Sequence, residues 1–189
     1  MLIKEKILEN LINILKKLNN LEQPDQVTGI LLKQSQLPDF FISFINSPYY
    51  NFDNRISKKE NILFILGYKF LSAIILFLVL YIKYKDKYKK NIDKIFKEAL
   101  KEGFKYSEAA KNEEAFLIGF ISKIQKYFSQ DDLEKIFKQA DFPPSLFSME
   151  NRDFFNLIHN LNEKDLKNIE KYSQILISLT KDYVKKLGI

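Results

Sequence analysis

Side chains that could bind a metal or act as a strong nucleophile are scarce in this sequence. Its 189 residues contain no cysteine and a single histidine, His159. Zinc sites built from three histidines, or from two histidines and a carboxylate, need more imidazoles than one such chain supplies, and a thiolate site is excluded. We interpret His159 as a surface or partly buried residue of a helical segment.

Other catalytic patterns are also missing from the sequence. No glycine-rich phosphate loop of either standard form occurs. The paired carboxylates Glu113-Glu114 and Asp131-Asp132 stand at the starts of predicted helices, where acidic side chains stabilise the helix N-terminus without any role in catalysis. We therefore predict a protein that is not an enzyme, with no catalytic residue, no metal site and no cofactor.

The charge of the chain is basic, with a formal net charge of +6 and a pI near 9.2. Such a balance can indicate nucleic acid as a partner. However, only two of the 30 basic residues are arginines, Arg55 and Arg152, so the forked guanidinium that binds phosphate is nearly missing. We do not expect nucleic-acid binding, and the lack of cysteine is consistent with a cytoplasmic location.

Hydrophobic periodicity predicts an all-α fold. Residues 3–18 place apolar side chains at steps of three and four, and the same spacing recurs along the chain, whereas no strand-like alternation persists. Asn162 is a suitable N-cap for the last helix. The predicted helices cover residues 3–18, 24–31, 37–45, 57–67, 70–82, 92–105, 112–127, 131–140, 152–160 and 162–187.

A polar loop follows the third predicted helix, which Ser47-Pro48 ends because the residue before proline avoids the α region. The loop carries side chains of types that often act as binding anchors. These are Tyr49, Tyr50, Phe52 and Arg55. In a second interpretation, Tyr50 and Phe52 instead pin the loop to the core.

The next helix has predicted signals at both ends. In Ser57-Lys58-Lys59-Glu60, the Ser57 hydroxyl and the Glu60 carboxylate match a capping box, in which each side chain accepts a hydrogen bond from the backbone amide of the other residue. Gly67 suits the left-handed backbone position that ends a helix.

Residues 70–82 are apolar except for Ser72, so a membrane span must be weighed against a buried core helix. The run has 13 residues, and about 20 are needed to cross the hydrocarbon core. Extending the run toward Ile62 would bring Gly67 and Lys69 into the bilayer. We predict a core helix and no transmembrane segment.

Residues 92–105 form an amphipathic pattern, with Ile92, Phe96, Ala99 and Gly103 on one face. The opposite face carries a stripe of lysines. These are Lys90, Lys94, Lys97, Lys101 and Lys105. The stripe is either a solvated surface or a contact with a partner or with acidic lipid.

The order of these features resembles the HDOD family, a bacterial signalling domain related to the HD phosphohydrolases. The resemblance is carried by an Asn-Ser-x-x-Tyr motif, an Ile-Ser pair and a Leu-Gly ending. The matching residues are Asn46, Ser47, Tyr50, Ile56, Ser57, Glu60, Leu66 and Gly67. It implies one all-α domain over residues 1–189, with an N-terminal bundle over 1–82 and an HD-like bundle over 83–189.

The segment from Glu113 to Gly119 resembles the one that leads into the His-Asp pair of HD proteins. The pair itself would fall at Ser122-Lys123, and an upstream histidine at Glu98. Ser122 and Lys123 supply neither a neutral imidazole nor a carboxylate to a metal. The resemblance therefore implies a degenerate, non-catalytic member of the family.

These observations predict a non-catalytic regulatory protein that contacts another signalling protein through the 47–55 loop, with a homodimer as a further possibility. The alternative is a module that binds a small anionic ligand such as a nucleotide, in a vestigial HD pocket lined by Lys97, Glu98 and Lys123. A third hypothesis, an enzyme with a surviving HD site, predicts metal-dependent phosphatase or phosphodiesterase activity.

Overall fold

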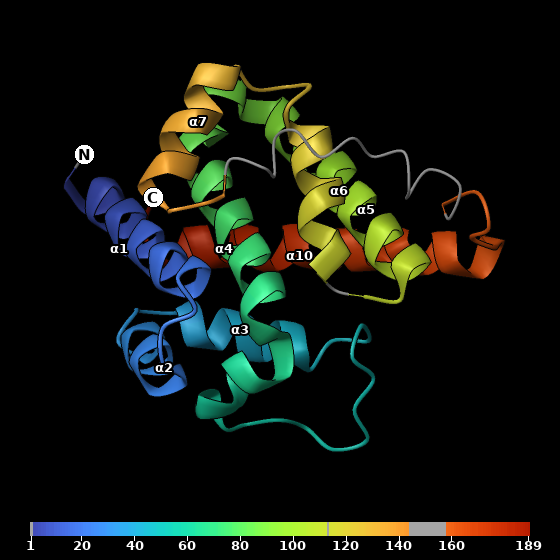
Figure 1. The fold of residues 1–189 in the computed structure, drawn as a ribbon, viewed down its shortest axis with the longest axis horizontal. Helices are drawn as coiled ribbons and strands as arrows, with labels where there is room; N and C mark the ends of the chain where they lie inside the picture. The colour runs from blue at the N-terminus through green and yellow to red at the C-terminus, as the bar shows by residue number, and fades with distance from the viewer. Residues whose placement is uncertain (1, 113, 144–157) are drawn as a thin grey trace.

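The computed structural model describes residues 2–112, 114–143 and 158–189 (Figure 1). Every regular element in these residues is a helix, which confirms the predicted all-α class. The elements are α1 (Leu2–Asn19), α2 (Pro24–Leu32), α3 (Leu37–Ile45), η1 (Lys59–Asn61), α4 (Ile62–Tyr88), η2 (Lys89–Asn91), α5 (Ile92–Ala110), α6 (Glu114–Ile124), α7 (Gln130–Gln139) and α10 (Glu163–Lys186).

Helix α4 lies at the centre of the molecule and contacts α1, α2, α3, α5 and α6. Every residue from Phe70 to Ile82 is buried, as predicted for a core helix. Its one polar residue in this run, Ser72, donates a hydrogen bond to Asn19 Oδ1 at 2.8 Å. The polar group is therefore satisfied inside the core, as buried hydroxyls require.

By length and composition alone, one stretch of the described chain, Lys59–Ala110, contains a window apolar enough to cross a membrane, with a mean hydropathy of 2.5. Of that window, 72% is buried against other parts of the same chain. A core helix passes the same test, so the window is weak evidence for a span.

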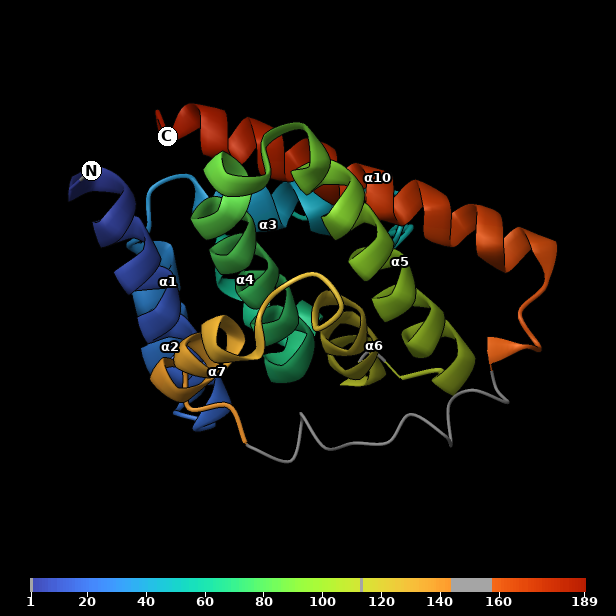
Figure 2. The same ribbon diagram turned by 90° about the horizontal axis from the view of Figure 1, so that it is seen from above.

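The remaining helices cover α4 from two sides. Figure 2 shows α10 on one side of α4 and α6 and α7 on the other. Helix α10 packs on α5 and α3, and α5 packs closely on α6. That last contact depends on Gly119, because a Cβ at this position would lie 2.6 Å from the Glu102 carbonyl oxygen.

The division predicted at residue 82 falls inside α4, which continues to Tyr88. Near this point Phe77 packs on Phe96 of α5 and Phe120 of α6, with ring centroids 5.3 and 6.2 Å apart. The two predicted bundles therefore share one central helix and one hydrophobic core.

Five of the described helices end with one residue at positive φ, four of them without glycine. The residues are Leu21 (φ 51°), Lys89 (φ 41°), Lys111 (φ 51°), Asp141 (φ 53°) and Gly188 (φ 71°). After α1, the amide of Glu22 bonds to Lys17 O at 3.1 Å and that of Leu21 to Leu18 O at 3.2 Å. This is the Schellman arrangement, in which glycine is the usual residue at the left-handed position.

Helix starts agree in part with the predictions. Asn162 caps the start of α10 as predicted, and it forms a full capping box with Asp165. Helix α7 begins one residue before Asp131, and Ser129 caps it by accepting from the amide of Asp132 at 3.3 Å. His159 is exposed in a turn, whereas residues 152–157 of the predicted helix lie outside the described residues.

Candidate functional site

The loop between α3 and η1 is closed by the side chain of one residue, Asn46. Its Nδ2 donates to the carbonyls of Ile42 at 2.9 Å and Ile56 at 2.7 Å, and its Oδ1 accepts from the amide of Ile56 at 2.7 Å. Asn46 thus joins the end of α3 to a residue ten positions later. The enclosed segment is a compact surface loop whose ends are held together, as in Ω-loops.

Ser47 sets the first turn of this loop. It is buried, its amide bonds to Phe44 O at 3.0 Å, and its Oγ accepts from the amide of Tyr49 at 3.3 Å. Such short-range bonds from serine favour turns over helix. The Asn-Ser pair of the predicted motif therefore has a structural explanation, since one residue closes the loop and the other turns it.

Tyr49 anchors the loop to four helices. Its ring lies 4.9–6.0 Å from four partners outside the loop, and it also packs edge-on against Tyr50 at 4.8 Å. The four partners are Phe44 of α3, Phe70 of α4, Phe104 of α5 and Tyr172 of α10. The Tyr49 ring is used in intramolecular packing while the residue is half-buried, and its contact with a partner stays a prediction.

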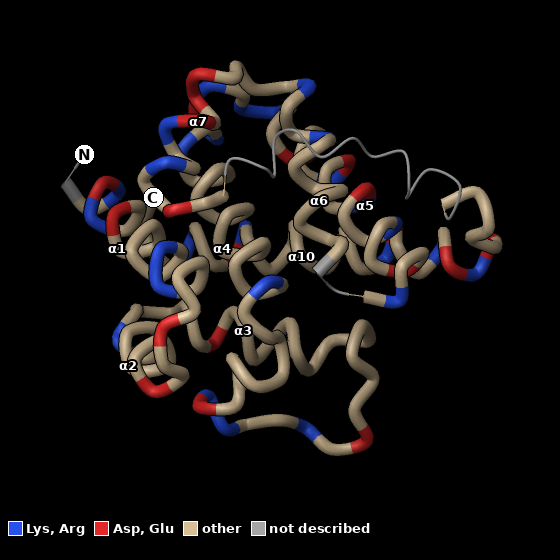
Figure 3. The backbone as a smooth tube through the Cα atoms, in the orientation of Figure 1, with Lys and Arg blue, Asp and Glu red and all other residues tan. Residues whose placement is uncertain are grey.

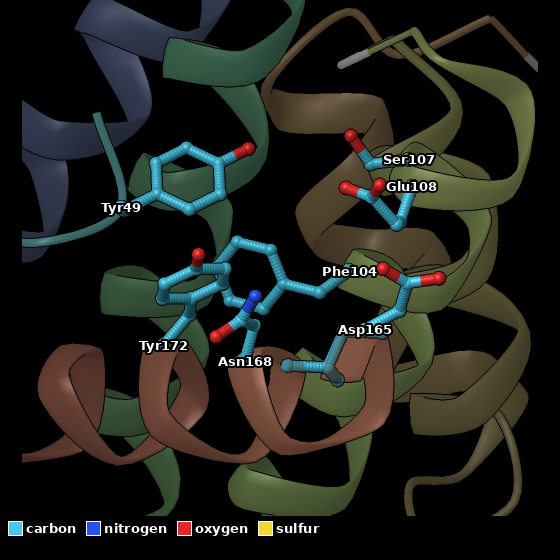
Figure 4. Close-up of a pocket in the computed structure, with 8 residues that line it drawn as sticks. Tyr49, Phe104, Ser107, Glu108, Asp165, Asn168 and Tyr172 are labelled. Carbon is cyan, nitrogen blue, oxygen red and sulfur yellow. The ribbon is translucent and has the colours of Figure 1, made fainter. Parts of the chain in front are cut away.

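A small polar cavity of about 50 Å³ lies beside this anchor (Figure 4). Tyr49 from the loop faces Tyr172 and Phe104, and Ser107, Glu108 and Asp165 lie at the other side. Burial, followed by the charge of Glu108, raises the pKa of the Tyr172 hydroxyl. At about 10–15 Å³ per water, the space holds a few waters and not a nucleotide.

The outer part of the loop is displayed to solvent. Residues 51–55 are all exposed, including Arg55. The rings of Tyr50 and Phe52 are nearly parallel, at 4° with centroids 5.6 Å apart, and Phe52 is 47% exposed. Tyr50 also meets Phe44 edge-on at 5.8 Å and is half-buried. Tyr50 therefore links the core to the displayed ring of Phe52, which gives partial support to the pinning interpretation.

The predicted capping box at Ser57 and Glu60 is not formed. The first helical residue is Lys59, its N-cap is Lys58, and no side chain caps this end. Because the helix starts one residue later than expected, Ser57 lies before the N-cap and Glu60 is one residue short of the required position. Both side chains are exposed.

Gly67 interrupts α4 at φ 67° and ψ 166°. The positive φ confirms that the backbone leaves helical geometry at this glycine. The conformation is the extended positive-φ region that is almost restricted to glycine, and not the left-handed helical region predicted for a helix end. Consequently the helix resumes at once and is bent, so Gly67 joins two segments.

The vestigial HD positions form surface contacts between α5 and α6. Lys123 pairs with Glu98 at 3.3 Å, and Tyr127 donates a short hydrogen bond to the same carboxylate. The Tyr127 bond and then the Lys123 contacts lower the pKa of Glu98. Ser122 lies half-buried beside them and donates to Gly119 O at 2.9 Å. The fold brings Glu98 and Lys123 together, and their charges neutralise each other.

Lys97, the third residue of the predicted nucleotide pocket, does not join the ion pair of Glu98 and Lys123. It pairs with Glu170 of α10, as does Lys101. Within the lysine stripe, Lys105 pairs with Glu102 at 3.4 Å, whereas Lys90 and Lys94 are exposed. Part of the stripe therefore holds α10 against α5. Acidic and basic residues are also interspersed along the described chain (Figure 3).

Comparison of the chain with models of protein families, with curated proteins and with solved structures finds no match. The resemblance to the HDOD family therefore rests on the sequence motifs alone. The sequence did not indicate Phe70, Phe104 and Tyr172 as the ring partners of Tyr49, because nothing in their local patterns indicates a loop packed against them.

Proposed function

We propose that the chain is a non-catalytic, cytoplasmic regulatory protein of bacterial signalling type that acts by binding another protein through the 47–55 loop. The observation that carries the proposal is the loop's construction. Its base is fixed by Asn46 and Tyr49, while Phe52 and Arg55 remain exposed.

A fixed loop with exposed aromatic and arginine side chains suits protein recognition for two reasons. Aromatic and arginine residues dominate the binding energy of many interfaces. A loop that is already held in one conformation loses less conformational entropy on binding than a mobile one does. Both features occur here in one segment.

The test is capture from cells with the purified chain as bait, repeated with the double variant Phe52→Ala/Arg55→Ala. Both side chains are exposed, so the variant should fold as the wild type does. We expect a specific partner to be recovered by the wild type and lost with the variant.

The matched control is Leu166→Ala/Lys167→Ala on α10. Leu166 is 44% exposed, close to the 47% of Phe52, and Lys167 is also exposed. The control should capture the partner as the wild type does. Equal capture by the loop variant and the wild type would overturn the proposed role of the loop.

The alternative function, nucleotide binding beside Lys97, Glu98 and Lys123, has no observation in its favour. Each of the two lysines contacts a carboxylate, on different neighbouring helices. None of the three cavities described in the structure is lined by these residues.

A further inference from the structure

A groove of about 540 Å³ opens beside the bend in α4. Its volume is within the range of roughly 300–1,000 Å³ found for ligand-binding clefts. The lining residues come from three parts of the chain: the turn after α1, the bend itself and the turn after α5. They are Leu21, Leu66, Gly67, Tyr68, Lys69, Phe70, Lys111 and Asn112.

The floor of the groove is apolar and its centre lacks a side chain. Leu66 and Phe70 are buried in the core beneath it. Gly67 stands between them, and a Cβ built at this glycine would meet nothing within 4 Å. The backbone bend therefore leaves open space above a hydrophobic base, where an apolar side chain of a ligand can be buried.

Two side chains at the rim occupy backbone positions that favour glycine. Leu21 and Lys111 are the left-handed residues that end α1 and α5. Asp141 has the same conformation, but its carboxylate accepts from Asn20 at 3.1 Å and pairs with Lys16 at 3.4 Å. Leu21 has no such internal role, since it is 62% exposed. At this positive φ, a bulky side chain such as that of Leu21 strains the backbone.

The charge of the rim is positive. Lys69 is exposed, and it forms no ion pair with the residues that the structure describes. Lys111 is also exposed but forms an ion pair with Glu108, which does not line the groove, so among the described residues Lys69 carries the uncompensated positive charge of the rim. No acidic residue occurs among the described lining residues. An apolar floor with a cationic rim is complementary to an apolar side chain flanked by a carboxylate.

We propose that this groove binds an acidic peptide segment of a partner protein, with one apolar side chain placed on Leu66 and Phe70 and a flanking carboxylate facing Lys69. This site goes beyond the proposed loop function, because the groove and the exposed part of the loop share no residue. Phe70 connects them indirectly, since its ring also packs on Tyr49 at 6.0 Å.

The experiment is selection of random phage-displayed peptides on the purified chain, followed by fluorescence anisotropy with the selected peptides. We expect enrichment of sequences in which Leu, Ile or Phe is flanked by Asp or Glu. Leu21→Gly and Lys69→Glu should each weaken the binding of such peptides by about tenfold or more. Leu21→Gly relieves the left-handed strain, so its melting temperature should not fall, and weaker binding would not reflect unfolding.

The control Lys90→Glu makes the same charge change at an exposed lysine outside the groove. It should leave peptide binding within about twofold of the wild type, as should the loop variant Phe52→Ala/Arg55→Ala. Selected peptides without acidic residues, or equal binding by the wild type, Leu21→Gly and Lys69→Glu, would overturn the proposal. Failure of the loop function would leave these results unchanged, so the two proposals can be judged separately.

Discussion

Asn46 is the residue on which the conformation of the 47–55 loop depends most directly. Removing its amide in Asn46→Ala leaves the carbonyls of Ile42 and Ile56 and the amide of Ile56 without these partners. Partly buried groups that lose hydrogen bonds cost about 1–3 kcal/mol. We expect a loss of that size in the free energy of unfolding, measured by urea denaturation.

The variant Asn46→Asp separates hydrogen bonding from side-chain size. The carboxylate of this variant can still accept the hydrogen bond from the amide of Ile56. It has no hydrogen to donate to the carbonyl oxygens of Ile42 and Ile56, which the Asn46 amide group serves in the wild type. The stability of the variant relative to wild type should therefore improve on acidification, as protonation restores an O–H donor. A gap between the two proteins that is constant from neutral to acidic pH would contradict the donor role.

Tyr49 provides the second prediction at this scale. Tyr49→Ala removes a ring that contacts five other rings, so the free energy of unfolding should fall by about 2–4 kcal/mol. Tyr49→Phe keeps the ring and should retain most of the stability. Thermal and urea unfolding of the two variants would measure the difference, and equal losses would show that the hydroxyl dominates over the ring.

The sequence could identify these motif residues but not which way each side chain points. The end of the third helix at Ser47-Pro48 was predicted from a short-range preference, whereas Asn46 was identified only through the family resemblance. Tyr49 and Tyr50 are adjacent and chemically the same, so their local sequence does not predict which ring packs on the later helices. Tyr49 packs on Tyr172 of α10, more than one hundred positions along the chain.

Among the elements, α4 depends on one glycine for its shape. At φ 67° and ψ 166°, an alanine would carry backbone strain of about 1–3 kcal/mol, although its Cβ would meet no other atom. We expect Gly67→Ala to lower the free energy of unfolding by that amount. The measurement is denaturant unfolding.

A contrasting variant identifies the cause of that loss. Gly29→Ala, within α2, also introduces a Cβ with nothing within 4 Å, but in ordinary helical geometry. It should be neutral or stabilising, because alanine favours helix over glycine. If both substitutions had the same effect, the loss at Gly67 would not come from its backbone conformation.

Helix positions could largely be predicted from sequence, but some helix ends could not. Asn162 was predicted as a cap from its residue type and its place before the last helix, and the structure adds Asp165, three residues away, as its capping-box partner. Ser57 and Glu60 show the same spacing and yet form no cap. The chain before them is already fixed, since Asn46 binds both backbone groups of Ile56. A contact across ten residues thus determines where the next helix can begin.

For the molecule as a whole, the ion pairs between α5 and α10 predict sensitivity to acid. Hydrogen bonds from Lys101 and Lys97 hold the pKa of Glu170 below its ordinary value of 4.5. The folded state thus favours the ionised carboxylate. Its stabilisation is complete above the unfolded-state pKa near 4.5, and it is lost as the pH falls through the lower folded-state pKa.

Glu170→Gln should therefore be less stable than the wild type at neutral pH, and the difference should shrink below about pH 4.5. Because the carboxylate is partly exposed, we expect no more than about 1 kcal/mol. Urea unfolding across this pH range measures the effect. The control Glu9→Gln changes an exposed carboxylate on α1 and should show no such trend, whereas a gap that persisted in acid would contradict the ion-pair explanation.

The fold class could be predicted from the sequence, since helical periodicity is strong and the long apolar run of α4 requires burial on every side. The division into two bundles could not be judged locally. Phe77 belongs to the first predicted half, yet its ring partners Phe96 and Phe120 belong to the second. Only the packed molecule shows that one helix serves both halves.

The hydrogen bonds that fix the Asn46 side chain also affect how fast this residue is chemically modified. An asparagine followed by serine is prone to deamidation, in which the next backbone nitrogen attacks the side-chain carbonyl. Here that nitrogen is bound to Phe44 O and the side chain is held by Ile42 and Ile56, so the native state resists the attack. Unfolding removes the protection, and the aspartate that results cannot close the loop as before. A molecule that has been unfolded for long enough is therefore deamidated at Asn46, and mass spectrometry of the peptide containing this residue detects the change.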